Sequence, residues 1–270
     1  MTTRLAVLGS PIAHSKSPLL HAAAYAELGL DWQYDAIEVT GEALAPFVAS
    51  LSSEWRGLSL TMPLKRDVLP LLASADQLVS VTGAANTVLL GDRIRGFNTD
   101  VYGITEAFRA AGVHSLTRVQ ILGGGATAAS ALAAAAQLGA TSAEVRLRNP
   151  LRVGTLDELG VDLGIPIEFR ALDLPEHATP DAVISTLPGH VEHTAAFSSA
   201  TRESAVLFDV AYDPWPSTLA STWLGPVISG LEMLTLQALA QVRVFVNGDP
   251  EIPLANESAV LAAMTRAVAL

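Results

Sequence analysis

The sequence contains no cysteine, which excludes disulfide bonds, thiolate nucleophiles and cysteine-ligated zinc. Its six histidines are scattered along the chain, so a metal site built from imidazole and carboxylate ligands is not expected either. No apolar run reaches the roughly 18 residues that a membrane span needs, and no basic segment leads into an apolar stretch after Met1. These absences predict a soluble, cytoplasmic protein with no bound metal.

Positive charge is also scarce. The formal net charge is −11, and no block of Lys and Arg could neutralise a phosphate backbone, so non-specific nucleic-acid binding is excluded. Of sixteen basic residues only Lys16 and Lys65 are lysines. A lysine can lose its proton when it is desolvated and an arginine cannot, so a lysine in such a chain is a candidate for proton transfer, although composition alone can leave one by chance.

Half of the 270 residues are hydrophobic, which is enough for two modest domains. In the first hundred residues, short apolar runs alternate with helical periodicity. This pattern predicts strands at residues 5–8, 32–39 and 57–61 and helices at 18–28 and 43–52. Residues 86–90 and 93–97 flank Gly91-Asp92, a strong hairpin signal. The N-terminal part is therefore predicted to be an α/β domain with a mixed sheet.

After Asp100 the pattern changes to a helix at residues 102–111, a strand at 118–122, a glycine turn, an alanine-rich helix ending at Gly139 and a strand at 144–147. Strand, glycine turn, helix and strand in this order predict the opening half of a doubly wound nucleotide-binding sheet. Further strands are predicted at residues 166–171, 182–185, 206–210 and 226–228, and helices at 231–246 and 258–269.

The predicted fold is α/β with two domains. An N-terminal mixed-sheet substrate-binding and catalytic domain comprises residues 1–101 and about 238–270, because the C-terminal helices are expected to return to it. A Rossmann-type, doubly wound dinucleotide-binding domain comprises residues 102–237.

The glycine turn fits the pattern G-x-G-x-x-A. It reads Gly123, Gly124, Gly125, Ala126, Thr127 and Ala128. The first glycine permits a tight turn, the second lets backbone approach a pyrophosphate, and the alanine allows close helix packing behind a helix N-terminus that faces the phosphates. The turn therefore predicts a bound dinucleotide, with a purely structural turn as the alternative.

The end of the next strand distinguishes the two nicotinamide dinucleotides. NAD sites place an acid there for the ribose hydroxyl, whereas a 2′-phosphate requires arginine. Here the strand is followed by Arg148, Asn149 and Arg152, with no acid among residues 147–152. The sequence thus favours NADP, unless both arginines are simply solvated surface residues.

Polar residues gather at the strand ends of the first domain. Ser15 and Ser17 are alternate residues, so in an extended backbone both hydroxyls reach one carboxylate, although Ser17 before a proline also fits a helix N-cap. Ser59 and Thr61 share a strand face just before Lys65. Side chains at strand ends line clefts in α/β proteins, and these could converge on one polyhydroxylated ligand.

Five ordered motifs resemble those of the shikimate dehydrogenase family, over nearly the whole chain. They are residues 11–18 (PIAHSKSP), 61–65 (TMPLK), 83–87 (GAANT), 98–103 (NTDVYG) and 230–234 (GLEML). The resemblance implies that Lys65 and Asp100 form the catalytic pair. It implies a substrate-binding set of Ser15, Ser17, Ser59, Thr61, Asn86, Tyr212 and Gln237. It adds to the glycine turn and the arginines a set of cofactor contacts, namely Thr186, Val210, Gly230 and Met233.

The chain departs from the family pattern at three places. Many members have Asn where this chain has Ser59. The polar residues that flank the two arginines of the family's 2′-phosphate patch are absent, and residues 185–188 (STLP) replace the usual Asn-Ala-Thr near the nicotinamide. Substrate affinity, NADP preference and the contacts of the nicotinamide ring are the properties that these changes affect.

The activity that the resemblance implies is the reversible, NADPH-dependent reduction of 3-dehydroshikimate to shikimate in aromatic amino acid biosynthesis, by a monomer or homodimer. The first alternative is an NAD-dependent quinate/shikimate dehydrogenase, which the missing acid after Leu147 disfavours. A second alternative is a non-catalytic NADP-binding regulatory protein, which would not need both Lys65 and Asp100. Methylene dehydrogenases of the folate type share the two-domain plan but do not explain the paired serines.

Overall fold

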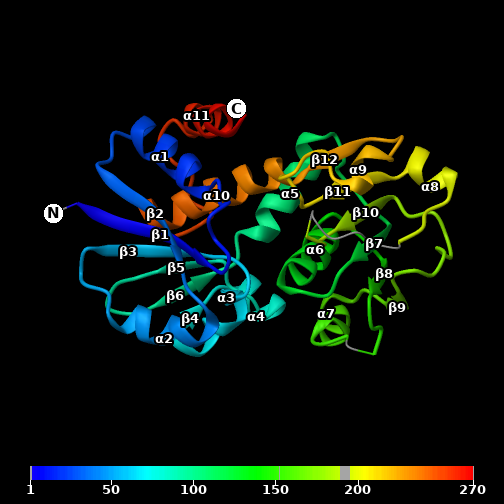
Figure 1. The fold of residues 1–270 in the computed structure, drawn as a ribbon, viewed down its shortest axis with the longest axis horizontal. Coiled ribbons are helices and arrows are strands. Elements are labelled where there is room, and N and C mark those ends of the chain that lie inside the picture. Colours follow the sequence, from blue (N-terminus) through cyan, green and yellow to red (C-terminus); the bar gives the residue numbers. More distant parts are fainter. Residues whose placement is uncertain (1, 152, 189–194, 270) are drawn as a thin grey trace. The chain divides into compact units, whose positions relative to one another are not determined.

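The computed structural model describes residues 2–151, 153–188 and 195–269 of the chain. These residues divide into two compact units, of which the first combines Met1–Gly103 with Leu234–Leu270 and the second is Ile104–Met233 (Figure 1). The C-terminal helices thus return to the N-terminal unit. No helix among the described residues is both long enough and apolar enough to cross a membrane.

The first unit is built on a mixed six-stranded sheet, as predicted, with the order β2-β1-β3-β5-β6-β4. The strands are β1 (Thr3–Gly9), β2 (Trp32–Glu38), β3 (Trp55–Leu60), β4 (Ser74–Ala75), β5 (Thr87–Leu89) and β6 (Arg95–Phe97). β1 is parallel to β2 and β3, whereas β5 is antiparallel to β3 and β6. The core between sheet and helices contains the fully buried Leu8, Leu58 and Leu64.

The hairpin of β5 and β6 exists, but its turn is longer than the two residues that Gly91-Asp92 suggested. The ladder ends at the pair Leu89 and Arg95. Leu90 donates its N–H to the carbonyl of Arg56, and the carbonyl of Ile94 accepts from Ala73. Because these backbone groups bond to other segments, they do not pair with each other across the hairpin.

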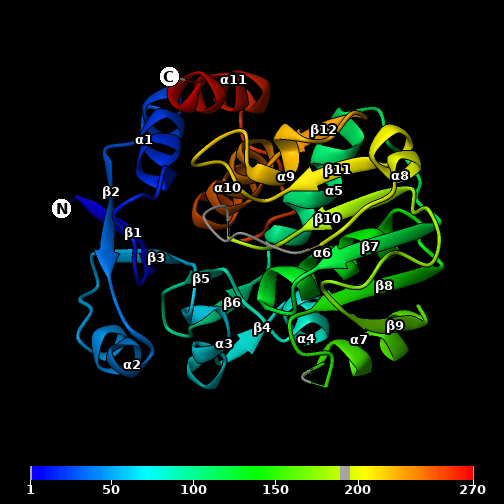
Figure 2. The ribbon, with the colours of Figure 1, turned by 45° about the vertical axis from the view of Figure 1, so that its right-hand side comes forward.

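Helices of the first unit are α1 (Ser17–Glu27), α2 (Gly41–Ala49), α3 (Leu64–Asp67), the 3-10 turn η1 (Leu69–Leu71), α4 (Gln77–Thr82) and α11 (Glu257–Val268). Two longer helices, α5 (Asp100–Ala110) and α10 (Gly230–Asn247), each contain a boundary between the units. α11 packs beside α1, as both views show (Figures 1 and 2). Residues from both ends of the sequence therefore share one core.

The second unit has an all-parallel sheet of order β12-β11-β10-β7-β8-β9, as the doubly wound pattern predicted. The strands are β7 (Arg118–Leu122), β8 (Ser142–Leu147), β9 (Ile167–Ala171), β10 (Ala182–Ser185), β11 (Val206–Asp209) and β12 (Val227–Ser229). The helices are α6 (Ala126–Gln137), α7 (Leu156–Leu163), α8 (Ser199–Ser204) and α9 (Thr218–Ser221). The strand order reverses between β7 and β10, which places the glycine turn after β7 at the topological switch point.

Candidate active site

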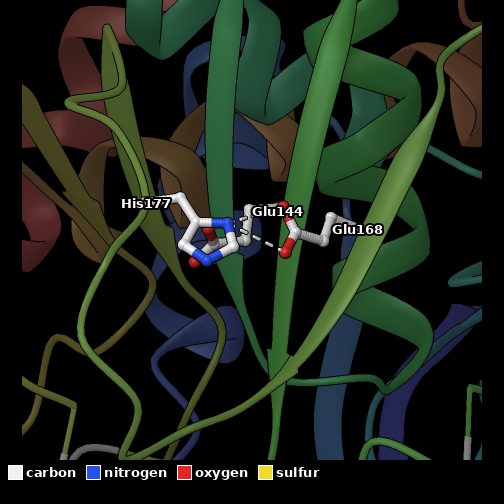
Figure 3. A group of neighbouring side chains, drawn as sticks. All are labelled: Glu144, Glu168 and His177. Carbon is white, nitrogen blue, oxygen red and sulfur yellow. Dashed lines mark hydrogen bonds and ion pairs between the residues drawn. The ribbon is translucent and has the colours of Figure 1, made fainter.

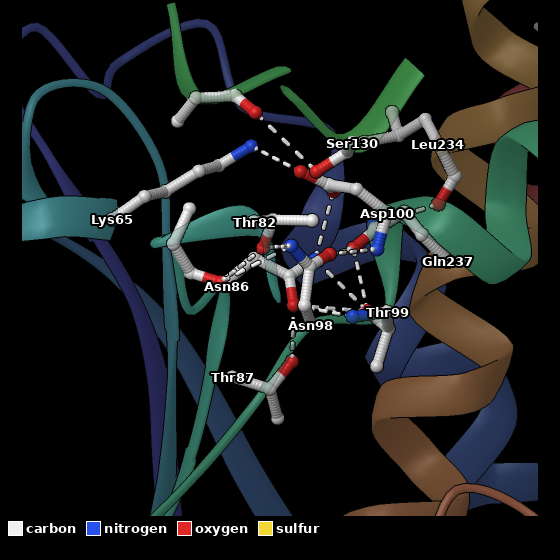
Figure 4. A network of polar contacts seen from close by, with 12 residues as sticks. Lys65, Thr82, Asn86, Thr87, Asn98, Thr99, Asp100, Ser130, Leu234 and Gln237 are labelled. Carbon is white, nitrogen blue, oxygen red and sulfur yellow. Dashed lines mark hydrogen bonds and ion pairs between the residues drawn. The ribbon is translucent and has the colours of Figure 1, made fainter. Parts of the chain in front are cut away.

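Lys65 and Asp100 form a short ion pair inside the first unit. Lys65 Nζ lies 2.6 Å from Asp100 Oδ2, and the two side chains are only 13% and 5% exposed. Lys65 is the second residue of α3, which the buried Leu64 anchors just after β3, and Asp100 is the first residue of α5. The Asp100 N–H donates to Asn98 Oδ1 at 3.1 Å, which fixes the start of α5. The geometry joins a largely buried cation to a carboxylate from a different element (Figure 4).

Asn86 holds the other oxygen of this carboxylate. Its Nδ2 donates to Asp100 Oδ1 at 2.8 Å and also lies 2.9 Å from Thr99 Oγ1 and 3.2 Å from Gln237 Oε1. An amide nitrogen carries two protons, so it serves at most two of these three acceptors at once. Asn86 Oδ1 accepts from Thr99 N and Thr87 Oγ1, each at 2.9 Å. Asp100 is therefore bound on both oxygens.

Gln237 reaches the same cluster from α10. Besides its contact with Asn86, its Nε2 donates to the carbonyl of Leu234 at 2.8 Å. Side chains from α3, β5, α5 and α10 thus meet around Asn86 (Figure 4). Four predicted site residues lie in this cluster: Lys65, Asn86, Asp100 and Gln237.

Ser59 and Thr61 are placed differently. Ser59 lies within β3 and is 3% exposed, and its Oγ accepts from Tyr34 Oη at 2.6 Å and donates to Gln241 Oε1 at 2.8 Å. Thr61 follows the end of β3 and is half-buried, with its N–H bonded to the carbonyl of Leu8. The hydroxyl of Ser59 is hence committed to protein partners.

Ser15 and Ser17 do not have the extended backbone that their alternation suggested. Lys16 has helical dihedrals (φ −85°, ψ −2°) and is the N-cap of α1, so the prediction of Ser17 as N-cap was wrong. Ser15 Oγ accepts from the N–H of Ser17 at 3.3 Å. Because the backbone turns at Lys16, the rule of alternating sides does not apply here.

The glycine turn of the second unit has the geometry that close backbone approach requires. Gly123 has φ +110°, and a Cβ added to it would lie 2.5 Å from Thr186 Oγ1, which itself donates to the carbonyl of Leu122 at 2.8 Å. A Cβ on Gly124 would lie 2.7 Å from Leu147 Cδ2. Gly125 is the N-cap of α6. Side chains are thus excluded where a pyrophosphate would meet the helix N-terminus.

The helix that follows the turn leaves its first residues accessible. Ala126 and Thr127 at the start of α6 are half-buried. From Ala128 to Ala135 the helix is buried, and its run of small residues lets it pack against β7. The N-terminus of α6 is thus accessible where the glycine pattern predicts the phosphates of a dinucleotide, and the binding roles of these residues stay a prediction.

The segment after β8 carries the predicted phosphate-binding residues. Arg148 and Asn149 are both exposed, and Asn149 Oδ1 accepts from the N–H of Leu151 at 3.1 Å. Arg152 lies outside the described residues. An exposed guanidinium at the end of β8 is the feature that a 2′-phosphate would need.

The remaining predicted cofactor contacts lie around the end of β11. The N–H of Val210 bonds to the carbonyl of Ser185 at 3.0 Å. A Cβ on Gly230 would overlap the carbonyl of Val210, so only glycine fits at the start of α10. Met233 is buried one turn later. Tyr212 is half-buried in the same unit, where burial, and secondly Asp213, raise the pKa of its phenol.

A group of acidic and imidazole side chains stands on the sheet of the second unit. The ligand atoms of Glu144, Glu168 and His177 lie within 4.8 Å of one another (Figure 3). Arg146 Nε donates to Glu144 at 2.8 Å, and Arg170 lies 3.7 Å from Glu144 and 3.9 Å from Glu168. Two guanidinium groups therefore already balance the two carboxylates, and the expectation of no bound metal remains a prediction.

Comparison with known proteins identifies the family of the chain. The profile of the shikimate dehydrogenase substrate binding domain matches residues 7–88. A curated shikimate dehydrogenase (NADP(+)) from Ignicoccus hospitalis is 31% identical over 256 residues, covering 91% of this chain and 94% of that protein. The crystal structure of the Mycobacterium tuberculosis shikimate dehydrogenase superposes with a TM-score of 0.85 at 36% identity, covering 98% of this chain and 99% of that one. The chain belongs to the shikimate dehydrogenase family.

A second solved family member has its ligands in place. The shikimate dehydrogenase of Thermus thermophilus, crystallised with NADP(H) and shikimate, superposes with a TM-score of 0.82 at 28% identity, covering 99% of this chain and 100% of that one. Within the present chain, Lys65 and Asn86 lie inside the segment that matches the family profile, whereas Asp100 and Gln237 lie beyond it. The cluster in Figure 4 therefore extends past the matched segment into α5 and α10.

Sequence reasoning assigned no role to Gln241, which belongs to the polar network. It lies one helical turn after Gln237, is 2% exposed, and bonds to Ser59 and to the main chain of Asn86. The spacing of four residues was the available signal, since i and i+4 share a helix face. Thr99 was part of a quoted motif but was not assigned a role, although its N–H and hydroxyl both contact Asn86.

Proposed function

We propose that the chain catalyses the reversible, NADPH-dependent reduction of 3-dehydroshikimate to shikimate, a step of aromatic amino acid biosynthesis. The observation that carries this proposal is the Lys65–Asp100 pair, 2.6 Å apart and held by Asn86 in a largely buried cluster. The ordered family motifs and the match of the whole chain to family members support the same activity.

Lys65 is the proton donor in this proposal. Reduction of a ketone develops negative charge on the oxygen, and an ammonium beside that oxygen stabilises a charge that exists mainly in the transition state. Lys65 gives its proton to the forming hydroxyl and takes one back in the reverse direction. Asp100 keeps the ammonium in place through its Oδ2 and accepts a hydrogen bond from a substrate hydroxyl.

The remaining polar residues bind the substrate. Ser15 and Ser17 take the carboxylate, and Thr61, Asn86 and Gln237 take ring hydroxyls. The amide of Asn86 has three acceptors within 3.2 Å and only two protons, so a hydroxyl of the substrate would compete for one proton and could itself donate to the acceptor that it displaces. Tyr212 supplies a further hydroxyl, and Ser59 acts through its neighbours.

NADP is the cofactor that the second unit fits. The glycine turn excludes side chains at Gly123 and Gly124, and the exposed Arg148 follows β8 in place of an acid. Gly123, Gly124, Gly125, Ala126, Thr127, Arg148, Asn149 and Arg152 would hold the phosphates, and Thr186, Val210, Gly230 and Met233 would hold the nicotinamide half. When bound, the cofactor supplies the hydride.

The test is steady-state oxidation of shikimate and of quinate, each with NADP and with NAD, followed by absorbance of the reduced nicotinamide. The proposal expects turnover of shikimate with NADP and at least about 100-fold less turnover when Lys65 is replaced by Met. Arg66→Ala, on the exposed side of the same helix, is the matched control and should keep normal turnover. Preferred turnover of quinate with NAD would favour the catabolic alternative, and absence of turnover with either substrate would contradict the proposed activity and favour the non-catalytic NADP-binding alternative.

A further inference from the structure

Gln241 is a buried amide whose hydrogen bonds all go to other elements of the first unit. Its Oε1 lies 2.8 Å from Ser59 Oγ and 3.2 Å from His21 Nε2. Its Nε2 donates to the main-chain carbonyl of Asn86 at 3.2 Å. Gln241 thus ties α10 to α1, to β3 and to the residue that leads into β5.

The neighbours of Gln241 allow only one direction for each of these bonds. An amide oxygen only accepts, so Ser59 donates to it and accepts in turn from Tyr34. Burial lowers the pKa of His21 to about 3, so the ring is neutral. It must donate from Nε2 to Gln241, which leaves Nδ1 to accept from Tyr25 Oη at 3.0 Å. The Gln241 amide therefore points its nitrogen toward the carbonyl of Asn86, because only this orientation allows all three of its hydrogen bonds.

This amide is connected to the candidate active site through Asn86. The carbonyl of Asn86 accepts from the N–H of Leu60 at 2.7 Å as well as from Gln241. The side-chain amide of Asn86 donates to Oδ1 of the Asp100 carboxylate, and the other oxygen of that carboxylate, Oδ2, accepts from Lys65. Two residues, Asn86 and Asp100, connect Gln241 to the Lys65 ammonium through hydrogen bonds, and Gln241 itself does not contact Lys65.

We propose that Gln241 is a positioning residue for the catalytic pair: it fixes the main chain of Asn86, and Asn86 in turn fixes the Asp100 carboxylate against Lys65. Gln237 binds the side chain of Asn86 from one turn earlier on α10, so the two glutamines hold this residue at both its amide and its carbonyl. The proposal rests on the function proposed above.

Ser59 is the partner that makes room for Gln241. With only 2.8 Å between Ser59 Oγ and Gln241 Oε1, the two further heavy atoms of an Asn side chain at position 59 would overlap the Gln241 amide. The small Ser59 in β3 therefore leaves space for the long Gln241 of α10, and the amide that bonds to the main chain of Asn86 comes from the helix and not from the strand.

The first test compares two buried substitutions. Gln241→Met keeps the length of the side chain and removes its three hydrogen bonds, whereas Tyr25→Phe removes a hydrogen bond to His21 without touching Gln241 or Asn86. We expect Gln241→Met to lower kcat for shikimate oxidation by about 10-fold or more while the KM for NADP stays within about twofold. Tyr25→Phe should keep kcat within about twofold. Equal kcat in the two variants would overturn the proposal.

A second measurement separates this inference from the proposed function. In a crystal structure of the Gln241→Met variant, Asn86 Nδ2 should move away from Asp100 Oδ1, beyond hydrogen-bond distance. If that distance stays at 2.8 Å, Gln241 does not position Asn86, whatever the substrate of the enzyme proves to be. If the parent protein fails to oxidise shikimate while Asn86 still moves in the variant, the positioning role stands and the proposed substrate is wrong.

A double-mutant cycle tests the pairing of Ser59 with Gln241. Ser59→Asn alone should lower kcat, because the added amide displaces Gln241. The double variant Ser59→Asn/Gln241→Ala places the amide on the strand and the small residue on the helix. Its kcat should be at least about 5-fold higher than the kcat of either single variant, Ser59→Asn or Gln241→Ala. Losses that simply add in the double variant would show that the two residues do not act as a unit.

Discussion

The imidazole of His21 lies flat against the phenol ring of Tyr34, with ring centroids 3.9 Å apart and planes 7° from parallel. Both rings are buried between α1, β2 and α10. Burial is the main cause of the pKa shift of each, lowering the pKa of His21 to about 3 and raising that of Tyr34. The stacked pair is therefore uncharged at every pH at which the protein is expected to work.

The neutral His21 makes the stability of the fold depend on pH. Unfolding returns the imidazole to its ordinary pKa of 6.5, so between about pH 3 and 6.5 the unfolded chain binds a proton that the folded chain does not. The free energy of unfolding should consequently fall as pH decreases through this window, and His21 should contribute up to about 1.4 kcal/mol per pH unit to that fall. Above pH 6.5 the titration of His21 should no longer change the free energy of unfolding. Urea unfolding at pH 7, 6 and 5 measures the slope.

Two variants isolate the contribution of the ring. His21→Gln removes the titrating group, so its stability should decline less steeply below pH 6.5 than that of the parent. Tyr25→Phe removes the hydrogen bond to His21 Nδ1 and should lower stability by a similar amount at each pH, leaving the slope intact. A His21→Gln slope identical to the parent's would mean that the imidazole binds protons equally in the folded and unfolded protein, so that burial does not lower its pKa.

Replacement of Asp100 by Asn should impair catalysis without impairing cofactor binding. If the new amide oxygen keeps the bond to Asn86 Nδ2, its NH2 group must face the Lys65 ammonium, which places donor against donor. We expect kcat to fall by about 100-fold or more, whereas the Kd for NADP stays within about threefold because the glycine turn belongs to the other unit. Steady-state kinetics and isothermal titration with NADP measure the two quantities.

Asp67→Asn is the matched control, because this carboxylate is exposed on α3, two residues after Lys65. It should retain parental kcat. If Asp100→Asn also retained it, the short ion pair would be structural and the assignment of Lys65 and Asp100 as the reacting pair would be wrong.

Much of the fold follows from local sequence signals. β7 and β10 were predicted with their observed bounds because each is a short run between turn residues, and all of their residues except Arg118 are buried in a parallel sheet. α4 was missed although Asp76 accepts from the N–H of Val79 as its N-cap and Gly83 closes it with φ +61°. Six residues are too few for helical periodicity, so only the capping signals could have revealed it.

The candidate site was less accessible from the sequence. Motif order placed Lys65 and Asp100 in one set. No local pattern, however, shows that Asn86 is hydrogen-bonded to α10 through both its side-chain amide and its main-chain carbonyl. The backbone at Lys16 is helical because of its place at the start of α1, which the alternation of Ser15 and Ser17 could not indicate. Contacts between distant segments depend on how the elements pack, and periodicity does not determine this.

Arg148 should set the preference between the two dinucleotides. It is exposed directly after β8, where a guanidinium can pair with a 2′-phosphate through charge-assisted bonds. Arg148→Ala should raise the KM for NADP by about 10-fold or more and leave the KM for NAD within about twofold. Arg118→Ala, an exposed arginine at the start of β7, is the control and should change neither. Equal losses with both dinucleotides would assign Arg148 a structural role.

Gly230 should tolerate no side chain, for a steric reason that is independent of any ligand. A Cβ at this position would overlap the carbonyl of Val210 and lie 2.9 Å from that of Ala211, so the start of α10 would have to move away from β11. We expect Gly230→Ala to lower the free energy of unfolding by about 1–3 kcal/mol. Gly91→Ala is the matched control, because a Cβ there meets nothing within 4 Å, and its unfolding curve should overlay that of the parent. Coincident curves for Gly230→Ala and the parent would show that the end of β11 and the start of α10 are not packed as closely as the structure places them.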